Sequence, residues 1–147
     1  MQIMKFTHSS KREQNIELFG LIGEFCACEV TRRALSCSIS SRPGQVWYVA
    51  VEDAAVYAFG SIRLQGKCGL LRHLYSPAHH NEAWEAVLRH CIEHARRCDA
   101  CSVRLTDYLA MENRYAQVGF IPFGNPRGRF TQYVLRLEPA YAATAMA

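Results

Sequence analysis

The 147-residue sequence contains no long hydrophobic run, no block of like charge and no internal repeat. A bilayer-spanning helix needs about 18–20 consecutive apolar residues, and no stretch approaches that length. The N-terminus, MQIMKFTHSSKREQ, lacks the cationic start and apolar run of a secretory signal, so we expect a cytoplasmic protein. Lys and Arg never occur more than two in a row, which argues against nucleic acid as a partner despite the net charge of +4.

Seven cysteines are an odd number, which does not suit a framework of paired disulfides. Cys98-Asp-Ala-Cys101 is a single CxxC, whereas a structural zinc site usually needs four ligands in two pairs. His90 and His94 fall on one side of a predicted helix nearby, so a Cys/His metal site is the alternative. We favour a packing role for Cys91 and Cys98, because free cysteine is often a small core residue, and therefore expect no metal.

Periodicity and turn residues divide the first half of the chain into a strand, a helix and a three-strand meander. Gln2–Phe6 predicts the strand, and Ser9-Ser10 followed by Glu13 predicts the start of the helix. The region from Ser36 to Gly44 is rich in Ser, Arg, Pro and Gly, which is typical of an irregular loop. The meander strands are predicted at Val46–Val51, Ala55–Leu64 and Gly69–Tyr75.

The second half begins with the most regular helix, predicted over Glu82–Arg97 with Asn81 as its N-cap. A strand at Ser102–Leu105 follows it directly, and a helix that joins two strands in this way implies a parallel crossover. The helix has one apolar side, formed by Trp84, Val87, Leu88, Cys91, Ala95 and Cys98. The remaining elements are a short helix over Met111–Val118, ended by Gly119, and a hairpin of Ile121–Phe123 with Thr131–Leu137.

This order of elements predicts an α+β fold with a mixed, mostly antiparallel central sheet flanked by helices. We expect a single domain over residues 1–138, followed by a flexible C-terminal tail over residues 139–147.

Two segments of the second half are similar to a known family. Tyr115-Ala-Gln-Val-Gly119-Phe120 resembles the Y-x-x-x-G-F signature of the GNAT acetyltransferase superfamily. Glu85–Arg96 (EAVLRHCIEHAR) resembles the helix that follows the pyrophosphate loop of that family. The hairpin, the third strand ending in Leu74-Tyr75 and a Pro-containing loop stand in the order of the family. The resemblance covers roughly residues 1–137 and implies a GNAT-like fold.

The resemblance also implies acetyl-CoA, or another acyl-CoA, as co-substrate. Its pantetheine would be held by strand-like hydrogen bonds at the splayed end of the third strand, by Leu74, Tyr75 and Ser76. Its pyrophosphate would be held at the start of the following helix, a position that favours anions. The backbone N–H groups there belong to His79, His80, Asn81, Glu82 and Ala83. The family loop usually contains glycines, whereas SPAHHNEAWEA contains none.

The resemblance assigns catalysis to a tyrosine and leaves the base open. Tyr115 would protonate the departing thiol, because a phenol with a pKa of about 10 stays protonated at neutral pH. His73 and Asp107 are the candidates for the base: a histidine titrates near neutrality, and Asp107 would act through a water or hold the substrate cation. The alternative for Tyr115 is a helix tyrosine that packs on the sheet.

Three functions follow from these features. The first is direct acyl transfer from acyl-CoA to a primary amine of a small molecule or a protein, without a membrane and in a monomer or homodimer. The second is a Mom-type nucleic-acid-modifying enzyme of GNAT-like fold, which the segment from Arg72 to Ala83 resembles. Its phosphate contacts would come from Arg63, Lys67, Arg127, Arg129 and Arg136. The third is a GNAT-like module that binds a ligand without catalysis, which would explain the missing glycines.

Overall fold

The computed structural model describes residues 1–35, 39–77 and 79–138, so the predicted tail over residues 139–147 lies outside the described residues. The chain divides into two compact units. The first consists of Met1–Arg63 and His73–Cys91, and the second of Leu64–Arg72 and Ile92–Ala147. A single domain over residues 1–138 stays a prediction.

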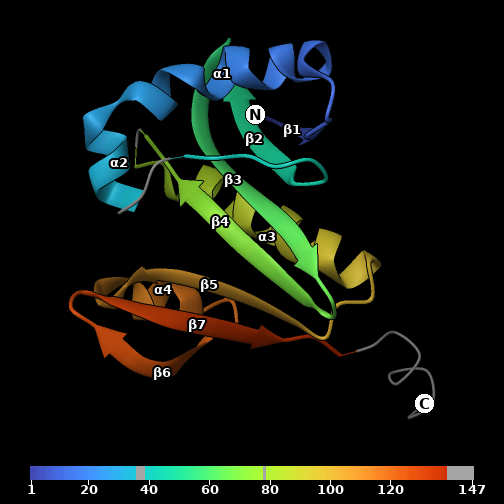
Figure 1. Ribbon diagram of the computed structural model, residues 1–147. Coiled ribbons are helices and arrows are strands. Elements are labelled where there is room, and N and C mark those ends of the chain that lie inside the picture. Colours follow the sequence, from blue (N-terminus) through green and yellow to red (C-terminus); the bar gives the residue numbers. More distant parts are fainter. Residues whose placement is uncertain (36–38, 78, 139–147) are drawn as a thin grey trace. The chain divides into compact units, whose positions relative to one another are not determined.

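Seven strands form one sheet in the order β1-β2-β3-β4-β5-β7-β6 (Figure 1). β4 and β5 pair in parallel, whereas β1 with β2, β2 with β3, β5 with β7 and β6 with β7 pair antiparallel. The predicted α+β fold with a mixed, mostly antiparallel sheet is confirmed. The strands are β1 Gln2–Thr7, β2 Val46–Glu52, β3 Ala55–Gln65, β4 Cys68–Tyr75, β5 Ser102–Tyr108, β6 Ile121–Arg127 and β7 Phe130–Arg136. The helices are η1 Arg12–Asn15, α1 Ile16–Ala27, α2 Glu29–Leu35, α3 Asn81–Arg97, η2 Leu109–Met111 and α4 Glu112–Ala116.

The core of the first unit explains the uninterrupted apolar run in β2. Trp47 and Val49 join one hydrophobic cluster with Leu18 and Ile22 of α1. Because successive side chains of a strand point to opposite faces, Tyr48 lies on the other face, where its ring centroid is 5.5 Å from that of His90 on α3. Helices on both faces therefore bury every residue from Val46 to Ala50.

Close packing of α3 on β3 depends on Gly60. A Cβ atom at this position would lie 3.1 Å from Leu74 Cδ1 and 3.1 Å from Val87 Cγ1. Those distances are below normal van der Waals contact, so a larger residue would push the helix away from the strand. A glycine here fixes the height of α3 above the sheet, and thereby the position of its N-terminus.

Replacing Trp84 with alanine is expected to destabilise the fold by about 3–5 kcal/mol, because its side chain is buried on the sheet-facing side of α3. Denaturant unfolding of the variant measures this free energy. Glu85→Ala is the matched control, since Glu85 is exposed on the same helix and pairs with exposed Arg89. The control should change stability by less than about 1 kcal/mol. Equal stability of both variants would contradict a core position for Trp84.

The second unit is organised around aromatic rings. Tyr115 of α4 packs against Phe120 and Tyr133, with ring centroids 5.6 Å and 4.7 Å away. Gly119 ends the short helix as predicted: it has a φ of +105°, and its N–H donates to the carbonyl of Ala116. The N–H of Phe120 donates back to the carbonyl of Tyr115, which completes a Schellman motif. This turn places Phe120 against the ring of Tyr115.

Two predicted boundaries are wrong. Regular helix begins only at Ile16, because the side chain of Asn15 bonds with the backbone of Ser9 and holds the preceding segment in a 3-10 turn. This helix ends at Ala27, because Cys28 has an extended backbone, and α2 begins at Glu29. The first strand of the terminal hairpin extends to Arg127 instead of ending at Phe123, with an irregular register between those two residues.

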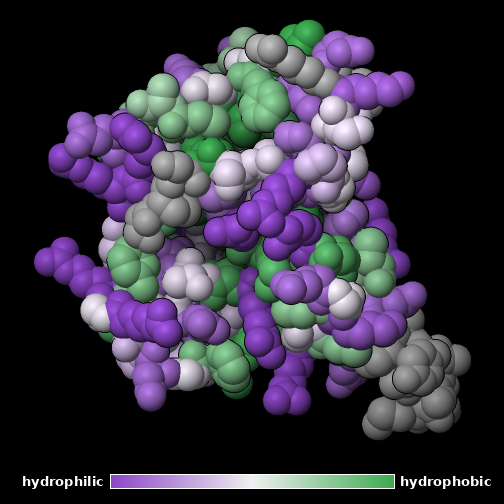
Figure 2. Space-filling view, viewed as in Figure 1, coloured by the Kyte–Doolittle hydropathy of each residue, from purple (hydrophilic) through white to green (hydrophobic). Residues whose placement is uncertain are grey.

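The surface carries hydrophobic side chains in several places, including Phe19 on α1, Val30 on α2 and Ile121 on β6. On the face that Figure 2 shows, hydrophobic and hydrophilic residues are interspersed. Among the helices of the described residues, none has both the length and the apolar character that a membrane crossing requires. A location in the cytoplasm stays a prediction.

Candidate functional site

Tyr115 and Asp107, two of the three predicted catalytic residues, lie in direct contact in the second unit. The Tyr115 hydroxyl donates a hydrogen bond of 2.5 Å to Oδ2 of Asp107. The other carboxylate oxygen, Oδ1, accepts the backbone N–H of Tyr108 at 2.7 Å. β5 ends with Asp107 and Tyr108, and the chain then turns through η2 into α4, which returns Tyr115 to the end of the strand.

Burial changes the acid–base properties of both groups. It raises the pKa of Asp107 above its ordinary value, against the opposing effects of the hydrogen bonds from Tyr115 and Tyr108 and the charge of Arg114. Burial, and after it the negative charge of Asp107, raises the pKa of Tyr115 well above its ordinary value. Asp107 is therefore a stronger base than an exposed aspartate, and Tyr115 stays protonated at neutral pH.

The Tyr115 hydroxyl does not point freely toward a ligand, as its predicted role as an acid would suggest. A phenol has a single proton, and the proton of Tyr115 points at Asp107. Its ring is fully buried among aromatic neighbours, as the packing alternative predicts. Donation to a thiolate therefore requires Asp107 to act with Tyr115, a coupling that the sequence analysis did not predict.

His73, the other candidate base, lies in the first unit and has structural contacts. Its ring stacks on Trp47, with centroids 5.8 Å apart and planes inclined by only 3°. Its Nε2 accepts the backbone N–H of Ser40 at 3.4 Å, so the lone pair that a base would use already has a donor. His73 also has a φ of +59°, an uncommon backbone conformation for a histidine within a strand. A catalytic role for His73 stays a prediction.

The predicted N-cap of α3 is wrong, because His80 caps the helix and Asn81 does not. His80 Nδ1 accepts the N–H of Ala83 at 3.1 Å. The Ser76 hydroxyl accepts the N–H of His80 at 2.7 Å, and the Ser76 carbonyl accepts the N–H of His79. A histidine ring can replace the usual Ser or Asp cap because an unprotonated ring nitrogen is a good acceptor.

These bonds change the predicted pyrophosphate site. Three of its five N–H donors, those of His79, His80 and Ala83, are already used within the chain. The N–H groups of Asn81 and Glu82 have no acceptor among the residues that the structure describes, and both residues are exposed. Two N–H groups at the N-terminus of a 17-residue helix still suit a phosphate, since the positive end of the helix dipole points at it.

The predicted pantetheine contacts lie at the end of β4. The Leu74 side chain is buried, and Tyr75 packs against Phe59 with ring centroids 5.9 Å apart. The Ser76 hydroxyl donates to the carbonyl of Tyr57 at 2.6 Å and thereby anchors the loop that leads into α3. Side chains at these positions serve packing, so any contact with pantetheine would come from their backbone groups.

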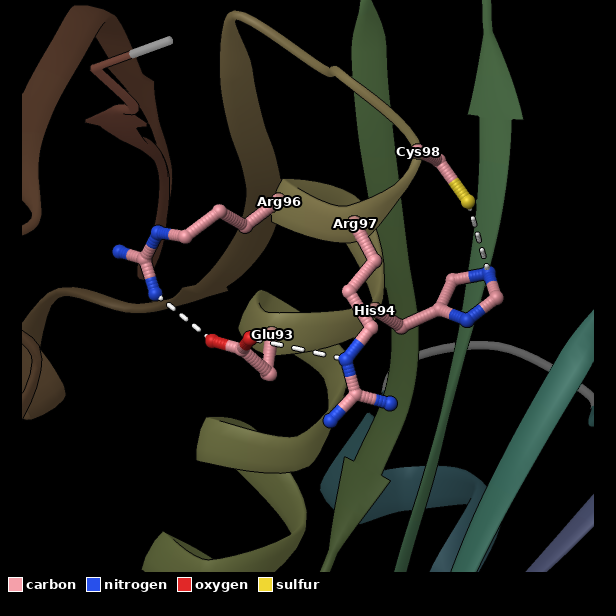
Figure 3. Close-up of polar contacts among 5 residues, drawn as sticks. All are labelled: Glu93, His94, Arg96, Arg97 and Cys98. Atoms are coloured by element: carbon pink, nitrogen blue, oxygen red, sulfur yellow. Dashed lines mark hydrogen bonds and ion pairs between the residues drawn. The ribbon is translucent and has the colours of Figure 1, made fainter. Parts of the chain in front are cut away.

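The cysteine-containing corner after α3 holds a Cys–His contact and no metal cluster. Cys98 Sγ lies 3.7 Å from His94 Nε2, beside ion pairs of Glu93 with Arg96 and Arg97 (Figure 3). His90 instead contacts the carbonyl of Ala86. Within the described part of the chain, no group of three or more His, Cys, Asp or Glu side chains is arranged to hold a metal ion.

A surface hollow where β5 ends was not predicted from the sequence. It has a volume of about 440 Å³ and is lined by Tyr108, Leu109, Ala110, Gly128 and Arg129. Residues 108–110 follow β5, and residues 128–129 form the turn between β6 and β7. A backbone bond of 2.8 Å from the Leu109 N–H to the Arg129 carbonyl holds the two segments together. No local sequence pattern could have predicted that residues 108–110 and 128–129, about twenty positions apart, lie together.

Comparison with known proteins shows the fold. No protein-family model and no curated protein matches the sequence. Among solved structures, ElaA of Escherichia coli matches with a TM-score of 0.70 at 15% identity, covering 92% of this chain and 99% of that chain. A GNAT-family acetyltransferase of Staphylococcus aureus matches with a TM-score of 0.63 at 12% identity, covering 93% and 100%.

The chain has the GNAT acetyltransferase fold. A third structure with the GNAT fold is the PaiA N-acetyltransferase of Thermoplasma acidophilum in complex with coenzyme A, with a TM-score of 0.62 at 13% identity. It covers 93% of this chain and 100% of that chain. The similarity extends along nearly the whole GNAT fold, as the resemblance of Tyr115–Phe120 and Glu85–Arg96 implies.

Proposed function

We propose that the chain transfers an acyl group directly from acyl-CoA, most often acetyl-CoA, to a primary amine. The GNAT fold supports the reaction class, and a similar structure, PaiA N-acetyltransferase, holds coenzyme A. The observation that carries the proposal is the buried Tyr115–Asp107 hydrogen bond of 2.5 Å. It couples a strengthened base to a protonated phenol, and acyl transfer to an amine needs both functions.

The amine reacts in its neutral form, after its ammonium ion has lost one proton to water. The reaction then moves a second proton from the nitrogen to the departing sulfur, and the pair can carry it. The amine nitrogen attacks the thioester carbonyl, and Asp107 takes the proton that the nitrogen loses. Tyr115 gives its proton to the thiolate as the C–S bond breaks, and protonated Asp107 restores the proton on Tyr115. No tyrosinate remains beside a carboxylate, which would be costly in a buried site. Asp107 therefore acts as base and Tyr115 as acid within one relay.

The residues at the start of α3 fit a phosphate of the co-substrate, although with two free N–H donors instead of the five that were predicted. The N–H groups of Asn81 and Glu82 would hold the pyrophosphate, with the exposed His79 imidazole within the same loop. His80 and Ser76 would not contact it through their N–H or hydroxyl groups, since both maintain the loop. Acyl-CoA supplies the activated thioester, and the chain supplies orientation and proton transfer.

Acetyl-CoA is expected to raise the unfolding temperature of the protein. At about one hundred times its dissociation constant, a bound ligand stabilises a fold by about 2.7 kcal/mol. Asn81→Pro should reduce this shift, because proline at the first helical position removes one N–H while preserving the helix. Asn81→Ala, which keeps the N–H, is the matched control and should retain the shift. Equal shifts for both variants would contradict the assigned pyrophosphate contact, and no shift at all would contradict the proposed function.

A ligand-binding module without catalysis is the second candidate. The three N–H groups that the chain itself occupies at His79, His80 and Ala83 favour it. To distinguish such a module from an acyltransferase, the protein is mixed with acetyl-CoA and a panel of amines, and the release of free thiol is measured. Binding of acetyl-CoA without release of thiol for any amine would support this candidate over acyl transfer.

A further inference from the structure

One face of the strands β5, β7 and β6 is not covered by α4. The three strands lie side by side in the sheet (Figure 1). Tyr115 of α4 packs against Tyr133 of β7, so α4 covers the face on which Tyr133 lies. Because side chains alternate along a strand, every second residue lies on the other face, which we call the open face. By strand register, the open face consists of Ser102, Arg104, Thr106 and Tyr108 of β5, Phe130, Gln132, Val134 and Arg136 of β7, and Ile121, Phe123 and Arg127 of β6.

Solvent reaches most side chains of the open face. Ile121 and Phe123, on the edge strand β6, are large and apolar and yet 58% and 43% exposed. Exposed polar side chains lie next to them, among them Thr106 and Gln132. An exposed apolar patch with a polar rim marks an interaction surface. The open face is therefore a candidate surface for a partner.

The charges of the open face are of one sign. Arg104, Arg127 and Arg136 are all exposed on it. Among the residues of β5, β6 and β7 only Asp107 is acidic, and it lies on the covered face, paired with Thr131. The open face therefore attracts an anion. A second copy of the chain is a poor partner, because a two-fold axis would set arginine against arginine.

Aromatic rings accompany these charges. The guanidinium carbon of Arg104 lies 4.9 Å from the ring centroid of Phe123. The rings of Tyr108 and Phe130 lie beside each other with centroids 4.4 Å apart. Stacking uses the flat side of a guanidinium, so its N–H donors, which lie in its plane, stay available for a phosphate. Exposed rings on a sheet offer stacking surfaces for nucleobases, which an acidic protein or a lipid headgroup lacks.

We infer that the open face binds single-stranded nucleic acid. Its arginines contact phosphates, and Phe123 and the pair of Tyr108 and Phe130 stack on bases. A duplex is a poorer partner, because its bases are already stacked on one another. From Phe130 to Arg136 the face is about 20 Å long, which suits a strand of several nucleotides. The inference goes beyond the proposed acyl transfer and uses neither member of the Tyr115–Asp107 pair.

Strand geometry explains why the sequence argued against this partner. Nucleic-acid binding is usually recognised by arginines and lysines that are close together in the chain. Arg104, Arg127 and Arg136 are far apart in the sequence and belong to three different strands. Pairing of β5, β7 and β6 brings them to one face, and side-chain alternation directs the acidic residue of these strands to the other.

Fluorescence anisotropy with labelled oligonucleotides of about 12 nucleotides tests the inference without acyl-CoA. The probes are oligo(dT), oligo(rU) and a DNA duplex of the same length. At least one single strand should bind about tenfold more tightly than the duplex, and the tighter of the two identifies DNA or RNA as the partner. Three phosphate contacts predict a loss of affinity of about twentyfold between about 50 and 200 mM salt. Absence of single-strand binding, or tighter binding of the duplex, would overturn the inference.

Variants of Phe123 test stacking on the open face. Phe123→Ala should weaken single-strand binding by about tenfold, whereas Phe123→Tyr, which retains an aromatic ring, should bind like the wild type. Phe19→Ala is the matched control, because Phe19 of α1 is 41% exposed and lies in the first unit. It should bind like the wild type. Equal affinities of Phe123→Ala and Phe19→Ala would overturn the inference.

Variants of Arg136 test the phosphate contacts. Arg136→Gln should weaken binding and reduce the slope of log affinity against log salt by about 0.7, the share of one phosphate contact. Arg42→Gln makes the same change of charge at an exposed arginine of the first unit and should leave the slope unchanged. The same slope in Arg136→Gln and Arg42→Gln would overturn the assigned contact, and with it the inference.

Other anionic partners are tested with two probes that lack bases. Vesicles with about 30% anionic phospholipid represent a membrane surface, and poly-L-glutamate represents an acidic protein. Both should bind more weakly than the single strands, and Phe123→Ala should leave their binding unchanged because they contain no base to stack. Tighter binding of either probe than of the single strands would overturn the inference.

Discussion

Replacing Tyr115 with phenylalanine is expected to lower kcat by about one to three orders of magnitude, with KM for acyl-CoA nearly unchanged. The substitution removes the only proton that the relay can pass to the departing thiolate. It retains the ring that packs between Phe120 and Tyr133, so the fold should persist. Steady-state kinetics with acetyl-CoA and an amine that the wild type accepts, followed through release of thiol, measures the effect.

Tyr133→Phe is the matched control for this variant. Tyr133 is also a fully buried tyrosine of the second unit, but its hydroxyl donates to the backbone carbonyl of Tyr108 at 2.8 Å and has no bond to Asp107. Loss of that hydroxyl should reduce stability by about 1–3 kcal/mol because it leaves a carbonyl without its donor. It should leave kcat within a few-fold of the wild type. Equal losses of kcat in the two variants would show that Tyr115 has only a packing role.

Replacing Asp107 with asparagine is expected to lower kcat by about two to four orders of magnitude. An amide has nearly the same shape and its oxygen can still accept one of the two hydrogen bonds, from Tyr115 or from Tyr108, but it cannot take a proton from an amine. The loss should persist at every pH, since no base replaces the carboxylate. Wild-type activity in Asp107→Asn would exclude Asp107 as the base and leave His73 as the predicted candidate.

Comparing the stability of the wild type with that of Asp107→Asn tests the charge of the carboxylate independently of catalysis. Burial raises the pKa of Asp107 in the folded state above its unfolded value. The folded state therefore binds this proton more tightly than the unfolded state, and its contribution to stability is lost as the pH rises through the folded pKa. Relative to Asp107→Asn, the wild type should lose unfolding temperature from about pH 4 upward. A difference independent of pH would contradict burial of an ionisable carboxylate.

The start of α3 shows where sequence reasoning about a site succeeds and where it fails. Apolar spacing correctly located the helix, and the general properties of a helix N-terminus indicated an anion site. The identity of the cap could not be read in the same way, because Asn81 is a common capping residue and histidine is not. Ser76 determines which residue caps the helix. Its hydroxyl is held by the carbonyl of Tyr57 on a neighbouring strand and accepts the N–H of His80, which orients His80 as the cap.

The sequence by itself determined the order of the elements and the buried side of α3. Val87 and Gly119 are examples, because side-chain periodicity and the backbone freedom of glycine act within a few residues of the chain. Only the tertiary structure decided which polar groups meet. It directs the proton of Tyr115 to Asp107 and brings Arg129 beside Leu109, because a hydrogen bond or an ion pair depends on distance and direction in space. The first of these contacts, and not the helical pattern, carries the proposed chemistry.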